Sequence, residues 1–226
     1  MNVKSENQPS MSPTPNSKRG IARRAGLVLA FAACLSLTGC FGFLKPSTTT
    51  ARRFVLTPLP AVAPGIASRG NPGIGVGQVK LAGYLFDTSL AVRKGTNEIE
   101  YLPLALWAER LDAGVQRTLA ANLASLLPKN QVRLSTWRKE DVAAEVYVAI
   151  EQFEVDANGR GALIAWWRIL SPGGEKTLKA GEFRLTREGP SPSADPAGSV
   201  ATLSELLADC SRQIAQVLGE VAPSVR

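Results

Sequence analysis

The sequence predicts an α+β fold in which a mixed, largely antiparallel sheet carries two amphipathic helices packed on one face. The first observation is a series of three long segments of strand composition, at 144–155, 161–170 and 177–186. They are separated by turns rich in glycine, asparagine or proline, which predicts an antiparallel meander. The second observation is a pair of apolar stripes at helical spacing. The third is a length of 226 residues, 45% of them hydrophobic, which suits one globular domain with tails.

The first 39 residues have the pattern of a secretory signal peptide. Basic residues at 18–24 precede an apolar run at 25–37, which is too short to span the roughly 30 Å hydrocarbon core of a bilayer. The run ends in Leu37-Thr38-Gly39-Cys40, which resembles a bacterial lipobox. We therefore expect cleavage between Gly39 and Cys40, and acyl chains on Cys40 that hold the protein on a membrane. A short membrane anchor that happens to contain a cysteine is the alternative.

These signals divide the chain into a signal peptide at 1–39, a lipidated tether at 40–51, one domain at 52–220 and a tail at 221–226. At about 3.3 Å per residue the tether reaches at most ~40 Å, which keeps the domain near its membrane. Phe41 follows the cysteine, where an aspartate favours retention in the inner membrane of enteric bacteria. We expect the periplasmic face of the outer membrane, with the inner membrane as the alternative.

Several short segments of the domain also have strand composition, and a stretch at 60–72 rich in proline and glycine predicts a surface loop. Phe54 and Leu56 face one way in the first of these segments, and residues 94–97 form a turn between two others. The predicted short strands are 53–59, the segment between Gly73 and Gly83, 90–93, 98–102 and 132–134.

Two stretches repeat apolar side chains every three or four residues and predict the two helices. The first begins at Leu104 and ends near Pro128, and the second spans 200–217. We expect both helices to bury their apolar stripes against one sheet face. The residues expected to meet in the core are Trp107, Leu111, Val115 and Leu119 of the first stripe and Val200, Leu207, Cys210 and Ile214 of the second.

The composition excludes several classes of function. The net charge is +7, but five of the 26 basic residues and one of the 19 acidic residues precede Cys40, so the cleaved chain would carry +3. A charge this weak and dispersed predicts no nucleic-acid binding. The chain contains no histidine, which excludes Ser-His-Asp and Cys-His nucleophile arrangements and imidazole metal sites. We predict no catalytic residue, metal site or cofactor, and a buried structural thiol at Cys210.

Two local motifs are interpreted as structural. Gly73-x-Gly75-x-Gly77 lacks the spacing of a nucleotide fingerprint, so we interpret it as a strand in which missing side chains admit a close neighbour. Trp166 and Trp167 are adjacent in a predicted strand and so face opposite ways, with at least one of them in the core. Neighbouring carboxylates are interpreted as solvated charges; they are Glu98 with Glu100, and Glu109 with Asp112.

Four segments of the domain occur in a recognisable order and spacing. They are residues 74–85, 92–93, 95–98 and 106–111, the last of which contains Trp107-Ala108-Glu109 and is expected to open the first helix. With the lipobox, they resemble the ABC-type transport auxiliary lipoprotein family, to which PqiC-like lipoproteins belong, over roughly residues 53–218. Gln78, Ala82 and Arg110 replace prolines that are common in the family, while the order and spacing of the segments are retained.

The resemblance implies a non-catalytic lipoprotein without ATP or metal sites. Its implied partners are an MCE-domain protein and an ABC permease and ATPase, which together move lipids or other hydrophobic molecules across the periplasm. Self-association of this chain into a homo-oligomer is left open. We interpret the loop at 84–88 and the turn at 93–98 as the partner-binding surface, because aromatic and polar loop residues seldom serve packing alone. The alternative is that the residues of these two segments serve only the geometry of the turns. The candidate contact residues are Tyr84, Leu85, Arg93, Asn97 and Glu98.

Two other functions stay open. One is a structural lipoprotein that braces or assembles an outer-membrane or envelope complex. The other is a periplasmic enzyme, which the absence of a clustered nucleophile and base disfavours. Neighbouring genes for an MCE-domain protein, an ABC permease and an ATPase would favour transport over both.

Overall fold

The sheet is organised around one long strand, β7 (Val142–Asp156), in the computed structural model, which describes residues 50–61 and 72–221. One edge of β7 pairs antiparallel with β8 (Gly161–Leu170), and β8 pairs antiparallel with β9 (Thr177–Arg187). The predicted antiparallel meander is therefore confirmed. The other edge of β7 is shared by three short parallel strands: β2 (Gly73–Val76), β3 (Lys80–Leu81) and β4 (Ser89–Arg93).

Three further strands complete the sheet. β5 (Ile99–Trp107) pairs antiparallel with β4 across the predicted turn at 94–97, and β1 (Arg52–Phe54) pairs parallel with β5. β6 (Val132–Leu134) pairs parallel with β2. Within residues 50–61 and 72–221 these nine strands form one mixed sheet whose longest ladders are antiparallel, as predicted.

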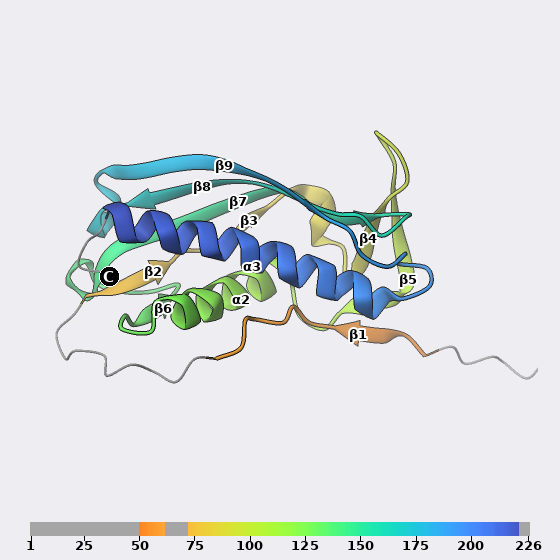
Figure 1. Ribbon diagram of the computed structural model, residues 1–226, viewed down its shortest axis with the longest axis horizontal. Helices are drawn as coiled ribbons and strands as arrows, with labels where there is room; N and C mark the ends of the chain where they lie inside the picture. Colours follow the sequence, from red (N-terminus) through yellow and green to blue (C-terminus); the bar gives the residue numbers. More distant parts are fainter. Residues whose placement is uncertain (1–49, 62–71, 222–226) are drawn as a thin grey trace, which may run out of the picture. The chain divides into compact units, whose positions relative to one another are not determined.

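Both helices lie on the same side of β7, β8 and β9, as Figure 1 shows. They are α2 (Leu111–Leu126) and α3 (Pro196–Val221). A Cβ atom added at Gly161 would lie 2.9 Å from Thr202 and 3.0 Å from Leu206, both of α3, so the odd-numbered residues of β8 face the helix. The predicted α+β architecture is confirmed.

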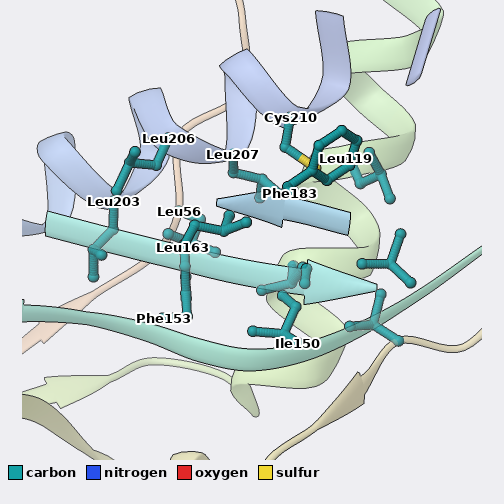
Figure 2. Packing of buried hydrophobic residues seen from close by; sticks show 14 of the residues in the cluster. Leu56, Leu119, Ile150, Phe153, Leu163, Phe183, Leu203, Leu206, Leu207 and Cys210 are labelled. Carbon is teal, nitrogen blue, oxygen red and sulfur yellow. The ribbon is translucent and has the colours of Figure 1, made fainter. Parts of the chain in front are cut away.

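The core lies between the helices and this face of the sheet (Figure 2). Leu203 and Leu207 of α3 pack with Phe153 of β7 and Leu163 of β8, and all four side chains are almost fully buried. Burying one such side chain contributes roughly 1.5–3 kcal/mol. The eight residues predicted to meet in the core are all buried. Cys210 is one of them, and its burial raises the pKa of its thiol, as expected of a structural cysteine.

The strand predicted at 53–59 is shorter than expected because polar side chains of the helices accept hydrogen bonds from its backbone. The N–H of Thr57 donates to Ser204 Oγ at 3.1 Å, and the N–H of Leu59 donates to Asn122 Oδ1 at 2.7 Å. Asn122 in turn donates to Ser211 Oγ at 3.0 Å and so links α2 to α3. These N–H groups are therefore used by the helices rather than by a neighbouring strand, and β1 ends at Phe54.

The predicted start of the first helix is wrong. Leu104 and Trp107 belong to β5, and the helix begins at Leu111. The N–H of Trp107 donates to the carbonyl of Thr88 at 2.7 Å, and that of Ala108 to the carbonyl of Phe54 at 2.8 Å. Two neighbouring strands therefore hold this segment extended, and Trp107 reaches the core by strand alternation instead of helical spacing.

The segment predicted as a strand between Gly73 and Gly83 contains two short strands, β2 and β3, separated by residues 77–79. The signal peptide, most of the tether, residues 62–71 of the predicted loop and the tail beyond Val221 lie outside the described residues.

Candidate functional site

Tyr84 and Arg93 meet on one buried carboxylate. Tyr84 lies in the 3-10 helix η2 (Gly83–Phe86) and Arg93 at the end of β4, and both reach Glu154 of β7. The Tyr84 hydroxyl donates to Glu154 Oε2 at 2.7 Å, and Arg93 Nε donates to Glu154 Oε1 at 2.6 Å. The Glu154 side chain is 1% exposed and that of Arg93 is 29% exposed. The two candidate segments are thus brought together on β7.

This cluster is held on every side by further hydrogen bonds. The N–H of Phe153 donates to Glu154 Oε2 at 2.9 Å, and Tyr101 Oη donates to the carbonyl of Tyr84 at 2.9 Å. Burial raises the pKa of Tyr84, and the adjacent Glu154 carboxylate raises it further because it disfavours a phenolate. Tyr84 is therefore a neutral donor at physiological pH, and the cluster fixes η2 and β4 to β7.

The other residues predicted from the sequence as functional lie in different environments. Leu85 is 2% exposed and packs in the core, so its side chain is not on the surface where a partner could contact it. Asn97 and Glu98 are exposed in the turn between β4 and β5. Gly39 and Cys40 lie outside the described residues.

A second buried carboxylate lies on the same face of β7. Glu145 is 4% exposed and accepts hydrogen bonds from Trp137 Nε1 at 3.0 Å, Tyr147 Oη at 3.1 Å and the N–H of Gly173 at 2.8 Å. A Cβ atom at Gly75 would lie 2.6 Å from the Trp137 ring, so only glycine admits this packing.

A Cβ atom added at Gly77 would likewise clash with the Tyr147 ring. The expectation that the glycine motif admits close neighbours is confirmed at both positions.

The face of the sheet that points away from the helices carries a hollow between these two clusters. Its volume is about 490 Å³. Ala149 pairs with Trp166, and Tyr147 with Arg168, so these four side chains share the helix-free face. The lining residues include Gln78, Lys80, Tyr147, Ala149, Trp166, Arg168 and Ala180.

Trp166 is the functional candidate that sequence reasoning missed. It is 49% exposed, whereas Trp167 is buried and stacks on Phe183 with ring centroids 5.5 Å apart. The predicted opposite orientation of the two tryptophans is confirmed. Strand alternation was the available signal, because it required one of two adjacent tryptophans to leave the core. A half-exposed tryptophan on an uncovered sheet face is typical of a binding surface.

The described part of the chain has neither a metal-binding cluster of side chains nor a membrane-spanning helix. Residues 50–61 and 72–221 contain no group of three or more His, Cys, Asp or Glu side chains placed to hold a metal ion. No helix in the same ranges is long and apolar enough to cross a bilayer.

The chain belongs to the ABC-type transport auxiliary lipoprotein family, because residues 54–215 match the model of the family described as "ABC-type transport auxiliary lipoprotein component". The resemblance drawn from the sequence segments is therefore confirmed, and the matched region includes both carboxylate clusters and the hollow. The family description establishes an auxiliary transport component that is a lipoprotein, and associates it with an ABC transport system.

Two solved structures share the fold. An uncharacterised protein has a TM-score of 0.62 at 22% identity, with 75% of this chain and 99% of that chain covered. Protein XCC0632 from Xanthomonas campestris, assigned to the family DUF330, has a TM-score of 0.59 at 13% identity, with 76% and 97% covered. At these identities the likeness concerns the fold alone. No curated protein matches the chain significantly in sequence.

Proposed function

We propose that this protein is a non-catalytic, lipid-anchored accessory of an ABC/MCE-type system that moves lipids or other hydrophobic molecules between membranes. Its partners are an MCE-domain protein and an ABC permease with its ATPase. The observation that carries the proposal is the family match over residues 54–215, which describes an auxiliary lipoprotein component of ABC-type transport. The absence of histidine from the chain and the aromatic, open sheet face support adhesion rather than turnover.

The anchor is the lipid on Cys40, and the domain stands at the periplasmic face of the outer membrane. The lipobox ending in Gly39-Cys40 and the phenylalanine at position 41 support this part of the proposal. Mass spectrometry of membrane-extracted protein should identify an acylated peptide that begins at Cys40. Cys40→Ser should leave an unprocessed or soluble product. Recovery of peptides that cross residues 25–50 from the mature protein would contradict the anchor, and fractionation of the two membranes tests the location.

The accessory role is tested by isolating the full-length lipidated protein from membranes of the cells that make it, in mild detergent. We expect the MCE-domain protein and the ABC permease to be enriched with the wild type. The matched control is Cys40→Ser, which keeps the domain but removes the lipid that anchors it to the membrane. Enrichment of outer-membrane assembly or bracing proteins alone would favour the structural lipoprotein instead.

The sequence candidates Tyr84, Arg93, Asn97 and Glu98 remain part of this proposal as partner contacts. Asn97 and Glu98 are exposed and so are available for direct contact. Tyr84 and Arg93 already bind Glu154, which supports a role in shaping the surface beside the turn. Asn97→Ala with Glu98→Ala should therefore weaken co-isolation without changing stability, while Tyr84→Ala should change both.

A further inference from the structure

The hollow around Trp166 lies on a face of the sheet that the helices leave uncovered. In residues 50–61 and 72–221, α2 and α3 both lie on the opposite side of β7, β8 and β9 (Figure 1). The floor of the hollow comes from paired residues of these strands and from β3, with Lys80 next to Ala149, and Ala149 next to Trp166. The site therefore stands on hydrogen-bonded strands rather than on loops, which gives it a fixed shape.

Two of the aromatic rings that line the hollow, those of Trp166 and Tyr147, are already oriented by hydrogen bonds. Trp166 Nε1 donates to Glu151 Oε1 at 2.8 Å, and Tyr147 Oη donates to Glu145 Oε2 at 3.1 Å. Each ring has its polar atom tied to a carboxylate, so its apolar surface remains for contact with another molecule. Rings fixed in this way lose little conformational entropy on binding.

The two charged residues that line the hollow are both cations. Lys80 and Arg168 line the hollow, and neither forms an ion pair or a side-chain hydrogen bond with any residue in the described ranges. No carboxylate is among the described residues that line the hollow. Of the carboxylates near it, Glu151 and Glu145 accept hydrogen bonds from the two rings, and Glu182 pairs with Arg184. The surface therefore offers two free cations beside an aromatic floor.

We infer that the Trp166 face binds an acidic segment of a partner protein, with one apolar side chain of that segment seated in the hollow. Trp166, Tyr147 and Arg168 are the residue types that most often dominate protein interfaces, and the free cations would steer and align an acidic partner. This inference rests on the proposed function and names the chemistry of the partner surface.

Site-specific photo-crosslinking in the cells that make the protein tests this directly. The photoreactive residue p-benzoylphenylalanine is introduced at position 166 of the full-length chain, and at Gln213 as the matched control. Gln213 is exposed on α3, on the other side of the sheet. We expect position 166, and not position 213, to capture a peptide of another protein that is net negative and carries an apolar residue at the crosslink.

Charge reversal supplies the second arm. Lys80→Glu combined with Arg168→Glu should reduce the crosslink at position 166 roughly tenfold or more, because two attractive contacts become repulsive. Lys129→Glu combined with Arg53→Glu makes the same change of charge at exposed residues outside the hollow and should have little effect. Reversal of the acidic residues in the captured peptide to lysine should restore the crosslink to the Lys80→Glu, Arg168→Glu chain.

The remaining outcomes overturn the inference. Capture of a second copy of this chain, a lipid adduct, a captured peptide without acidic residues, or no crosslink at position 166 would each do so. If the wild type co-isolates with the ABC system but position 166 captures nothing, this inference fails and the proposed function stands. If an acidic segment is captured but no ABC or MCE component co-isolates, the proposed function fails and the inference about the Trp166 face stands.

Discussion

Replacement of Glu154 by glutamine tests the cluster that unites the two candidate segments. Glu154 Oε2 accepts from Tyr84 and from the N–H of Phe153, while Oε1 accepts from Arg93. An amide has one acceptor oxygen, so its NH₂ group must face either Arg93 or the other two donors. At least one hydrogen bond to a charged group is lost, at about 1.5–3 kcal/mol. Because Arg93 is 29% exposed, water can solvate it, which keeps the loss below the ~3–5 kcal/mol of a fully buried pair.

Urea unfolding of the detergent-solubilised full chain, followed by tryptophan fluorescence, measures this loss. We expect Glu154→Gln to lower the free energy of unfolding by about 2 kcal/mol, and a double-mutant cycle with Arg93→Met to give a coupling of roughly 0.5–3 kcal/mol. Glu151→Gln is the matched control on the same strand. It should cost under ~0.5 kcal/mol because this side chain is exposed and glutamine keeps an acceptor oxygen for Trp166 Nε1. A cost for Glu154→Gln as small as that of the control would refute the buried ion pair.

Three further changes have defined outcomes. Leu111→Ala should lower the free energy of unfolding by ~2–5 kcal/mol, because its side chain is buried at the start of α2. Gly75→Ala should cost ~1–3 kcal/mol and alter tryptophan fluorescence, because the new Cβ forces the Trp137 ring away from Glu145. Tyr84 has a folded-state pKa above its unfolded value of 10.0, so its contribution to stability is complete below pH 10 and is lost as pH rises towards the folded-state pKa. Tyr84→Phe should therefore flatten the alkaline decline in stability measured by urea unfolding.

Each of these expectations has a result that contradicts it. Leu134→Ala is the control for Leu111→Ala, since Leu134 is exposed, and equal small losses would remove Leu111 from the core. Unchanged fluorescence in Gly75→Ala would mean that Trp137 does not pack on the glycine. An alkaline decline of the same steepness with and without Tyr84 would mean that its phenol ionises as readily in the folded chain as in the unfolded one.

The meander and α3 could be predicted because their periodicity is local. Alternating burial along β8 and the turn at 156–159 determine the pairing of β7 with β8. The apolar residues of α3 recur at helical spacing over residues 200–217, so the buried face can be predicted without the rest of the chain. Patterns of this kind depend only on near neighbours in sequence.

The start of α2 could not be predicted from the same kind of pattern. Leu104, Trp107 and Leu111 are spaced as in a helix, yet the first two are in β5 because Thr88 and Phe54 supply strand partners. Those partners are distant in sequence, so helical spacing alone gave no sign of them.

The candidate site was predicted in part. The sequence points to Tyr84 and Arg93 but not to Glu154, which accepts hydrogen bonds from both. The two hydrogen bonds to Glu154 span 70 and 61 residues of sequence. A β-bulge between Ile150 and Gln152 also shifts the alternation of β7, so Phe153 enters the core and Glu154 lies, buried, on the face without helices. A strict alternation carried past Ile150 would have assigned both residues to the wrong face.

Genetic epistasis tests whether this protein serves an ABC transport system by binding. Sensitivity to hydrophobic toxic compounds is measured in cells lacking this protein, cells lacking the ABC ATPase, and cells lacking both. We expect equal defects in all three and full rescue of the first by the wild-type gene but not by Cys40→Ser. Additive defects, or a defect that soluble Cys40→Ser protein corrects completely, would contradict it.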